Sequence, residues 1–177
     1  MRKVIALLLS MLLLLSGCSL ALDNIKEPVE FYYLRACSTP DDHKTYFTEG
    51  AIAPETREAT GRRQDLYYLL SMYLRGPQDS QLVSPFPTGS TVVKIRQEDR
   101  KLTVYLNAVA ANLEDFDLTL ANACLAKTCL ALADVDTVYI ESRGINDKIL
   151  FSATMTADDL ILKESPPPST DGPEETQ

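Results

Sequence analysis

Residues 66–77 read Leu-Tyr-Tyr-Leu-Leu-Ser-Met-Tyr-Leu-Arg-Gly-Pro, and their spacing predicts an amphipathic helix. The apolar side chains fall at the i, i+3, i+4, i+7 and i+8 positions of one helical face: Leu66, Leu69, Leu70, Tyr73 and Leu74. Thr60 is the candidate N-cap of this helix. Gly76-Pro77 ends it, because glycine accepts the left-handed conformation just past a helix and proline cannot continue one.

A β-hairpin is predicted after this helix. A loop rich in proline and glycine leads to a strand at residues 91–96, a turn at 98–100 and a second strand at 102–106. Apolar residues alternate with polar ones in both strands, and the apolar set is Val93, Ile95, Leu102, Val104 and Leu106. This period of two predicts one buried face and one polar face.

The elements on either side of the hairpin complete an α+β pattern. A second helix is predicted from Asp115 or Asp117, either of which is a candidate N-cap, to about Ala133. Its buried stripe comprises Leu118, Ala121, Leu125, Thr128 and Leu132. Further strands are predicted at residues 29–34, 135–141 and 149–153, and at 51–58 as an edge strand, because Pro54 cannot donate a ladder hydrogen bond. This order predicts a two-layer sandwich in which two helices pack on one small mixed β-sheet.

The amino terminus has the layout of a bacterial lipoprotein signal peptide. Arg2 and Lys3 precede an uninterrupted run of twelve apolar or small residues from Val4 to Leu15. That run is shorter than the roughly 20 residues that span a bilayer. Leu15-Ser16-Gly17-Cys18 matches a lipobox, which predicts cleavage between Gly17 and Cys18 and a diacylglycerol thioether on Cys18. We expect a signal peptide at residues 1–17, a lipidated tether at 18–28, and an extracytoplasmic protein on the cell membrane, or on the outer membrane in a two-membrane envelope.

Composition bounds the remainder of the chain. The 177 residues include 17 basic and 25 acidic side chains, which gives a net charge of −8. This acidity disfavours nucleic acid and anionic lipid head groups as partners. We expect one domain at residues 29–163, because roughly 160 residues remain after cleavage. The acidic, proline-rich residues 164–177 are expected to form a disordered tail.

The stretch from Leu66 to Arg143 resembles the GerMN domain of the spore germination and sporulation lipoproteins. The shared features are the helix end at residues 73–77, the Pro- and Gly-containing loop at 84–90, the hairpin strand at 102–107, the second helix and the strand at 135–140. Family members usually carry Asp in that hairpin strand, where this chain has Tyr105 or Asn107. The resemblance implies a fold similar to the ring-building motifs of secretion systems, and a role in assembling envelope complexes during sporulation or germination.

Catalytic chemistry is not indicated by the residues present. The single histidine, His43, lies beside Asp41 and Asp42 in a loop, and tetrahedral zinc needs three or four organised ligands. Glu114, Asp115 and Asp117 resemble paired catalytic carboxylates, but acidic residues are also typical of a helix amino terminus. The sequence contains no phosphate-binding glycine loop, HExxH or G-x-S-x-G motif. We therefore expect no enzymatic activity, no cofactor and no metal.

Three cysteines besides Cys18 are present: Cys37, Cys124 and Cys129. Three cannot form a closed disulfide framework within one chain. On a helix, the five-residue offset of Cys124 and Cys129 points their side chains in different directions, although Cys37 could reach one of them. We expect small buried apolar residues, with a redox or metal role as the alternative.

Tyrosines are the expected contact residues. Tyr32, Tyr67, Tyr68 and Tyr105 are predicted to point away from the apolar faces, and the loop Ser84–Ser90, with Pro85 and Phe86, is a second candidate surface. Three functions fit these features. The favoured one is an adaptor lipoprotein that binds other envelope proteins through a sheet edge or helix face, with or without oligomerisation. The others are a binding module for a cell-wall or small extracellular ligand, and a hydrolase.

Overall fold

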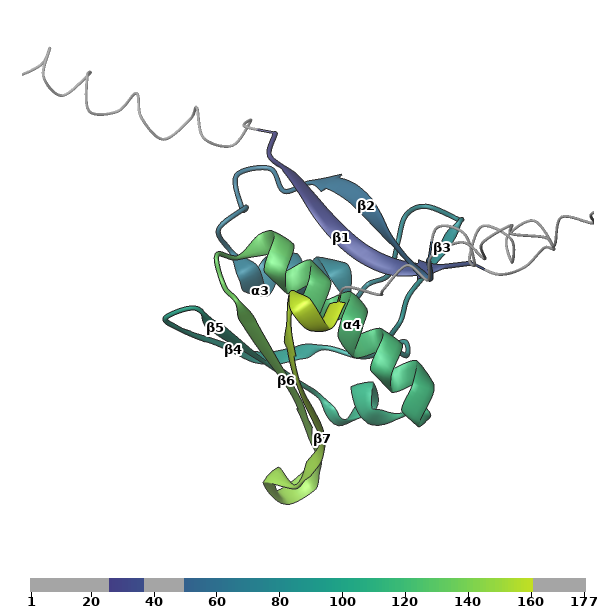
Figure 1. The fold of residues 1–177 in the computed structure, drawn as a ribbon, viewed down its shortest axis with the longest axis vertical. Helices are drawn as coiled ribbons and strands as arrows, with labels where there is room; N and C mark the ends of the chain where they lie inside the picture. Colours follow the sequence, from purple (N-terminus) through teal and green to yellow (C-terminus); the bar gives the residue numbers. More distant parts are fainter. Residues whose placement is uncertain (1–25, 37–49, 161–177) are drawn as a thin grey trace, which may run out of the picture.

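The computed structural model describes residues 26–36 and 50–160, which form two helices and two β-sheets (Figure 1). The first sheet has the order β2-β1-β3, with β1 (Pro28–Arg35), β2 (Ile52–Glu58) and β3 (Leu82–Val83). The second has the order β4-β5-β6-β7, with β4 (Val92–Glu98), β5 (Lys101–Leu106), β6 (Thr137–Arg143) and β7 (Ile149–Thr156). The helices are α3 (Leu66–Tyr73) and α4 (Asp115–Leu132), and η1 (Ala108–Ala111), η2 (Ile145–Asp147) and η3 (Asp158–Leu160) are short 3₁₀ turns.

The α+β class is confirmed, but the strands divide into two sheets where one mixed sheet was expected. Among the described strands, only β5 and β6 pair in parallel, and the other pairs are antiparallel. Helix α4 packs along β1. The amide of Tyr32 in β1 donates a hydrogen bond of 2.9 Å to Oγ1 of Thr128 in α4. A helix side chain thereby satisfies a backbone group that another strand would otherwise pair.

Helix α3 is held by its own cap and by an aromatic core. Its N-cap is Asp65, whose carboxylate accepts from the Tyr68 amide at 2.9 Å, so the assignment of Thr60 was wrong. Thr60 precedes the cap in a turn with φ of 29°. The Tyr73 ring stacks on Tyr33 with centroids 4.8 Å apart. Gly76 has φ of 95° and ends the helix as expected.

Helix α4 packs on β1 of the first sheet and on β6 and β7 of the second. It is therefore buried on more than one side, and both Cys124 and Cys129 are fully buried, unpaired thiols. Burial raises the pKa of Cys124 to about 12 and also raises that of Cys129. The expectation of small buried residues is confirmed for these two, whereas Cys37 lies outside the described residues.

The start of α4 was predicted correctly, but its N-cap is Glu114, which makes no side-chain cap hydrogen bond. Neither predicted aspartate is the cap. Asp115 and Asp117 lie in the first turn, where their charges face the positive end of the helix dipole.

The hairpin β4–β5 carries a bulge that changes which valine is buried. Register shifts between Val92 and Lys94, so that Val92 pairs with Leu106 while Lys94 pairs with Tyr105. Val92 is 4% exposed and Val93 is 62% exposed. The assignment of Val93 to the apolar face was therefore wrong, because the extra residue of the bulge reverses the alternation at this end of the strand.

These adjacent valines provide a matched pair for a stability measurement. We expect Val92→Ala to lower the free energy of unfolding by about 2 kcal/mol, since buried methyl groups are lost and a cavity remains. Val93→Ala is expected to change it by less than about 0.5 kcal/mol. Urea unfolding followed by circular dichroism measures both. Equal losses in the two variants would contradict the bulge.

The predictions for residues 1–17, for Gly17 and Cys18, for His43 and for the tail at 164–177 lie outside the described residues. Within the described ranges, neither helix is long and apolar enough to cross a membrane.

Candidate interaction site

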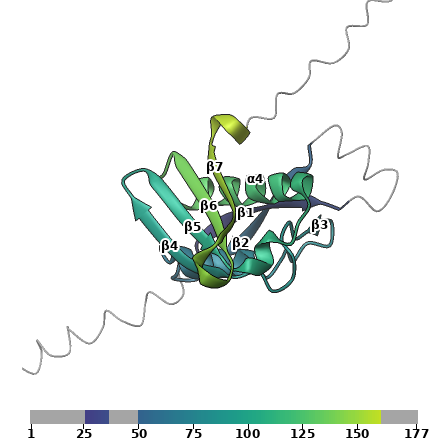
Figure 2. The ribbon, with the colours of Figure 1, turned by 90° about the horizontal axis from the view of Figure 1, so that it is seen from below.

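One face of the second sheet packs on the core and the other faces away from α4 (Figure 2). The core face carries the fully buried Leu102, Val104, Val138 and Ile140. The opposite side chains form cross-strand rows that follow from the pairing registers. We call them the open face: Lys94, Arg96 and Glu98 of β4; Lys101, Thr103 and Tyr105 of β5; Tyr139, Glu141 and Arg143 of β6; Ser152 and Thr154 of β7. All of these side chains except Glu141 are exposed or half-buried.

Two tyrosines of the open face lie under basic side chains. Lys94 Nζ is 5.9 Å from the Tyr105 ring centre, and the Arg143 guanidinium is 5.8 Å from the same ring. Lys101 Nζ is 5.1 Å from the Tyr139 ring centre. Such cation–π contacts hold flexible cationic chains over the rings. The face therefore presents ordered tyrosine and arginine groups, the residue types that are enriched at protein interfaces.

Glu141 lies at the centre of the open face and organises its neighbours. Although its strand position faces outward, it is only 3% exposed. Its carboxylate accepts a hydrogen bond of 2.8 Å from the Tyr139 hydroxyl and another from Arg143 Nε. The bond from Arg143 lowers the pKa of Glu141, while the bond to Glu141 raises the pKa of Tyr139. At neutral pH Glu141 is therefore ionised and Tyr139 is a hydrogen-bond donor.

The open face differs in charge from the rest of the chain. It carries four basic side chains and two acidic ones, in a protein of net charge −8. One of the two acids, Glu141, is covered by its partners. A surface with this basic excess attracts an acidic partner. It also repels a second copy of this acidic protein less than the net charge of −8 suggests.

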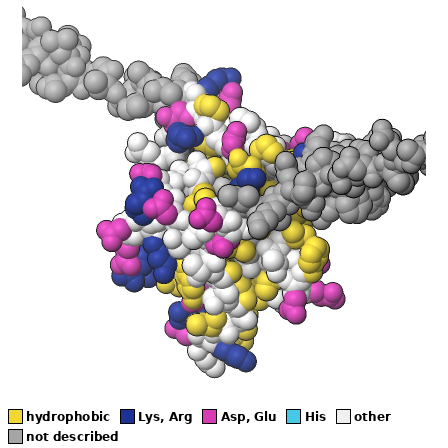
Figure 3. All heavy atoms as spheres, in the orientation of Figure 1, with side chains coloured by type: hydrophobic (Ala, Val, Ile, Leu, Met, Phe, Trp, Pro, Cys, Tyr) yellow, Lys and Arg dark blue, Asp and Glu magenta, His cyan; other side chains and the backbone are white. Residues whose placement is uncertain are grey.

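An apolar projection adjoins the open face. The turn between β6 and β7 extends from the body of the protein (Figure 1) and exposes Ile145, Ile149 and Leu150 at 89%, 51% and 44%. Hydrophobic side chains reach the surface near this end of the molecule (Figure 3). Exposed apolar residues that are grouped, and not scattered singly, are typical of protein contact sites.

The predicted contact residues do not form one surface. Tyr105 lies on the open face, and Tyr32 lies on the first sheet, where Lys127 Nζ is 4.8 Å from its ring centre. Tyr68 lies under Arg62, whose guanidinium is 4.7 Å from its ring centre. Tyr67 is 53% exposed on α3.

Pro85 and Phe86 were assigned to the surface wrongly. Both are buried, and Phe86, at 4% exposure, packs into the core because its apolar ring gains by leaving water. Tyr139, Glu141 and Arg143 were missed. The signal for Tyr139 and Glu141 was available, since they alternate with the apolar Val138 and Ile140 in the predicted strand, whereas Arg143 lies beyond its predicted end at residue 141.

Comparisons with solved structures identify the fold. No family model matches the chain, and no curated protein does. Among solved structures, the tandem GerMN domains of the sporulation protein GerM from Bacillus subtilis match 69% of this chain with a TM-score of 0.52 and 17% identity. The chain spans 40% of the length of that structure. The fold is that of a GerMN domain. The first GerMN domain of the same protein matches 75% of this chain and 99% of its own length, with a TM-score of 0.48 and 15% identity.

The GerMN-like fold agrees with the resemblance drawn from the hairpin, the helix end and the second helix. Tyr105, which with Asn107 is one of the two positions where the family usually has Asp, lies beneath two cationic side chains on the open face.

Proposed function

We propose that this protein is a lipid-anchored, extracytoplasmic adaptor that binds acidic envelope proteins through its open face. The observation that carries the proposal is the uncovered, ordered array of Tyr105, Tyr139 and Arg143 on the second sheet. Its basic charge favours an acidic partner, and the apolar β6–β7 projection supplies additional contact area. The lipobox at Cys18 supports the location, because a diacylglycerol keeps the domain at a membrane surface.

The cellular process in which this binding takes place is also proposed, and that proposal starts from the fold. The solved GerMN domains belong to a sporulation protein, and a chain of the same fold can serve an envelope complex of sporulation or germination. The role proposed is assembly and not catalysis. The partners are other envelope proteins, and a ring or another oligomer is one arrangement that such contacts could build.

The test is in-cell cross-linking of the tagged, full-length protein, followed by mass spectrometry of the captured proteins in growing and sporulating cells. We expect the same few envelope proteins to be captured by the parent chain. Tyr105→Ala should weaken capture about 30-fold, which corresponds to roughly 2 kcal/mol for a central tyrosine of an interface. The loss follows from removing a ring on which two cations rest.

The matched control is Tyr67→Ala, which removes an exposed tyrosine from α3 and leaves the open face intact. It should capture the parent set in parent amounts. Circular dichroism on both variants verifies that each is folded. Undiminished capture by folded Tyr105→Ala, or loss in Tyr67→Ala alone, would place the contact elsewhere and refute the proposal for the open face.

A further inference from the structure

A second surface feature lies away from the open face, between α3 and the loop that precedes β4. It is a groove of about 460 Å³, a size within the range of small-molecule sites. Helix α3 supplies Tyr67 and Ser71, and the two residues after it supply Leu74 and Arg75. Residues 84–92 supply the other wall. Leu74, Phe86 and Val92 are its apolar lining residues, and most of the others carry a hydroxyl group.

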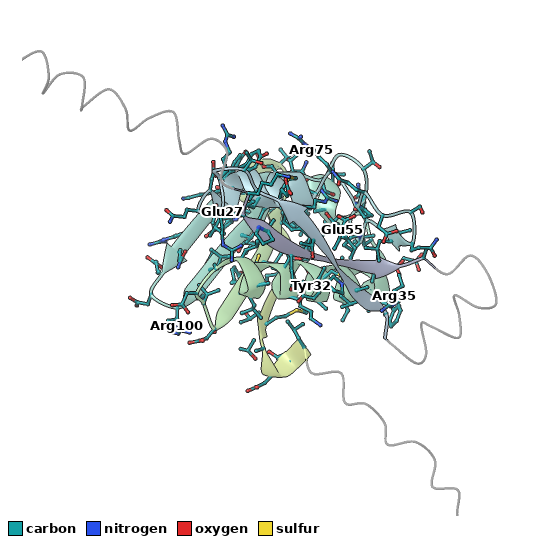
Figure 4. All side chains as sticks on the ribbon, turned by 90° about the horizontal axis from the view of Figure 1, so that it is seen from above. Glu27, Tyr32, Arg35, Glu55, Arg75 and Arg100 are labelled. Carbon is teal, nitrogen blue, oxygen red and sulfur yellow. The ribbon has the colours of Figure 1, made fainter. Side chains whose placement is uncertain are left out.

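The described part of the groove carries one charge, and it is positive. Among the described residues that line the groove, Arg75 is the only charged one, in a chain with 25 acidic side chains. Figure 4 shows Arg75 at the periphery of the domain. Among the described residues its guanidinium has no hydrogen-bond or ion-pair partner. An unpaired guanidinium is suited to bidentate recognition of a carboxylate.

Some hydroxyl groups that line the groove already donate hydrogen bonds within the protein, and one has no partner among the described residues. Ser71 donates to the Tyr67 carbonyl at 2.6 Å, and Ser84 donates to the Phe86 carbonyl at 3.1 Å. In contrast, Ser90 is 5% exposed and its hydroxyl has no hydrogen-bond partner among the described residues. A buried hydroxyl without a partner is uncommon in folded proteins and indicates a site that water or a ligand completes.

The aromatic group of the groove is held in place. The Tyr67 hydroxyl donates to the carbonyl of Val92 at 3.1 Å, which ties the ring across the groove, while the side chain stays 53% exposed. A fixed, exposed aromatic ring offers a flat apolar surface with a polar end. Together with the hydroxyls, this lining matches a ligand that is itself hydroxylated and has an apolar ring face.

We infer that the groove between α3 and residues 84–92 binds an acidic saccharide: a sugar ring that lies against Tyr67 and carries a carboxylate paired with Arg75. The hydroxyls of the sugar exchange hydrogen bonds with the Ser and Thr side chains of the loop. Such a ligand is available outside the cytoplasm in carboxylated wall sugars. This activity goes beyond the adaptor function and uses none of the open-face residues.

The test measures the affinity of two sugars for the full-length protein in detergent by saturation-transfer NMR titration. N-Acetylmuramate carries a lactyl carboxylate, and N-acetylglucosamine has the same ring without it. We expect N-acetylmuramate to bind about tenfold more tightly, because a charge-assisted hydrogen bond adds to the shared ring contacts. Arg75→Gln should reduce this ratio to about one, and Tyr67→Ala should weaken both sugars.

The controls separate this inference from the adaptor proposal. Arg96→Gln removes the same charge from the open face and should leave the ratio of the two affinities unchanged, as should Tyr105→Ala. Equal affinities for the two sugars in the parent chain, no binding of either, or an unchanged ratio in folded Arg75→Gln would overturn the inference. Acetate that competes as effectively as N-acetylmuramate would also overturn it, because the groove would then be a simple anion site.

Discussion

Arg57→Ala is expected to lower the free energy of unfolding by about 3–5 kcal/mol, since it breaks a buried ion pair by removing one partner. The side chains of Arg57 and Glu55 are 6% and 9% exposed, and they are in direct contact. The guanidinium also donates to the carbonyl of Gly76 at 2.6 Å and to the Tyr33 hydroxyl at 3.2 Å. Its loss therefore leaves a buried carboxylate and several acceptors without their donor.

The contacts of Glu55 explain why this pair matters for the fold. Its Oε1 accepts from the amides of Gln78 and Asp79 at 2.6 and 2.7 Å. The ion pair thereby fastens β2 to the segment that follows α3. Figure 4 shows Glu55 on the first sheet. Thermal and urea unfolding of the variant would report the loss, and the exposed pair Arg96–Glu98, at 58% and 61%, is the control.

Arg96→Ala should cost less than about 1 kcal/mol, because solvent screens exposed pairs. The double variant Glu55→Leu with Arg57→Met tests the coupling. The double variant should lose less free energy of unfolding than Glu55→Leu and Arg57→Met lose in sum. It should still be less stable than the parent, because the amides of Gln78 and Asp79 lose their acceptor. A loss of under 1 kcal/mol in Arg57→Ala would show that the pair contributes little and that the packing around it holds β2.

Periodicity predicted most elements because each shows one face to the core. The helix at residues 66–74, the hairpin and the strand containing Val138 and Ile140 all follow the expected 3.6- or 2-residue spacing. The strand β2 was predicted only as an edge. Burial along this strand does not follow hydrophobicity, since the charged Glu55 and Arg57 face inward with Ala53, while Pro54 faces outward. Charged residues are almost always exposed unless paired, and a partner two residues away on the same strand is not visible as such in a pattern of hydrophobicity.

The division into two sheets could not be predicted for a related reason. The packing of α4 along β1 includes a hydrogen bond between Tyr32 and Thr128, which are 96 residues apart. Local spacing predicts strands but does not determine which strands pair. The bulge at Val93 is also invisible, because a one-residue insertion looks like uninterrupted β-branched sequence until the partner strand is known.

The candidate site was found in part. Tyr105 was singled out because it alternates with buried residues, and the same rule applied to the next predicted strand would have selected Tyr139 and Glu141. Arg143 lies two residues past the predicted end of that strand and was not accessible to the rule. The pairing of β5 with β6 in parallel brings these residues beside Tyr105. Pro85 and Phe86 failed as predictions because proline and glycine indicate a loop, while nothing in a loop sequence tells which side chains turn inward.

Cys18→Ala is expected to abolish lipid attachment completely and to leave a precursor that retains residues 1–17. The thioether bond needs the Cys18 sulfur, and no other residue of the lipobox can replace it. Two acyl chains give stable anchoring, because each buried methylene contributes about 0.8 kcal/mol and a single chain binds only marginally. Metabolic labelling with a palmitate analogue, together with the mass of the purified protein, measures both consequences.

Cys37→Ala is the matched control, since it removes another cysteine near the amino terminus and leaves the lipobox intact. It should incorporate the parent amount of label. Equal labelling of Cys18→Ala and the parent would refute the lipoprotein assignment. The same variant also separates location from recognition in the adaptor proposal. Cys18→Ala has an unchanged open face, so it should bind a partner in solution with parent affinity but lose capture in cells wherever that partner lies at the membrane.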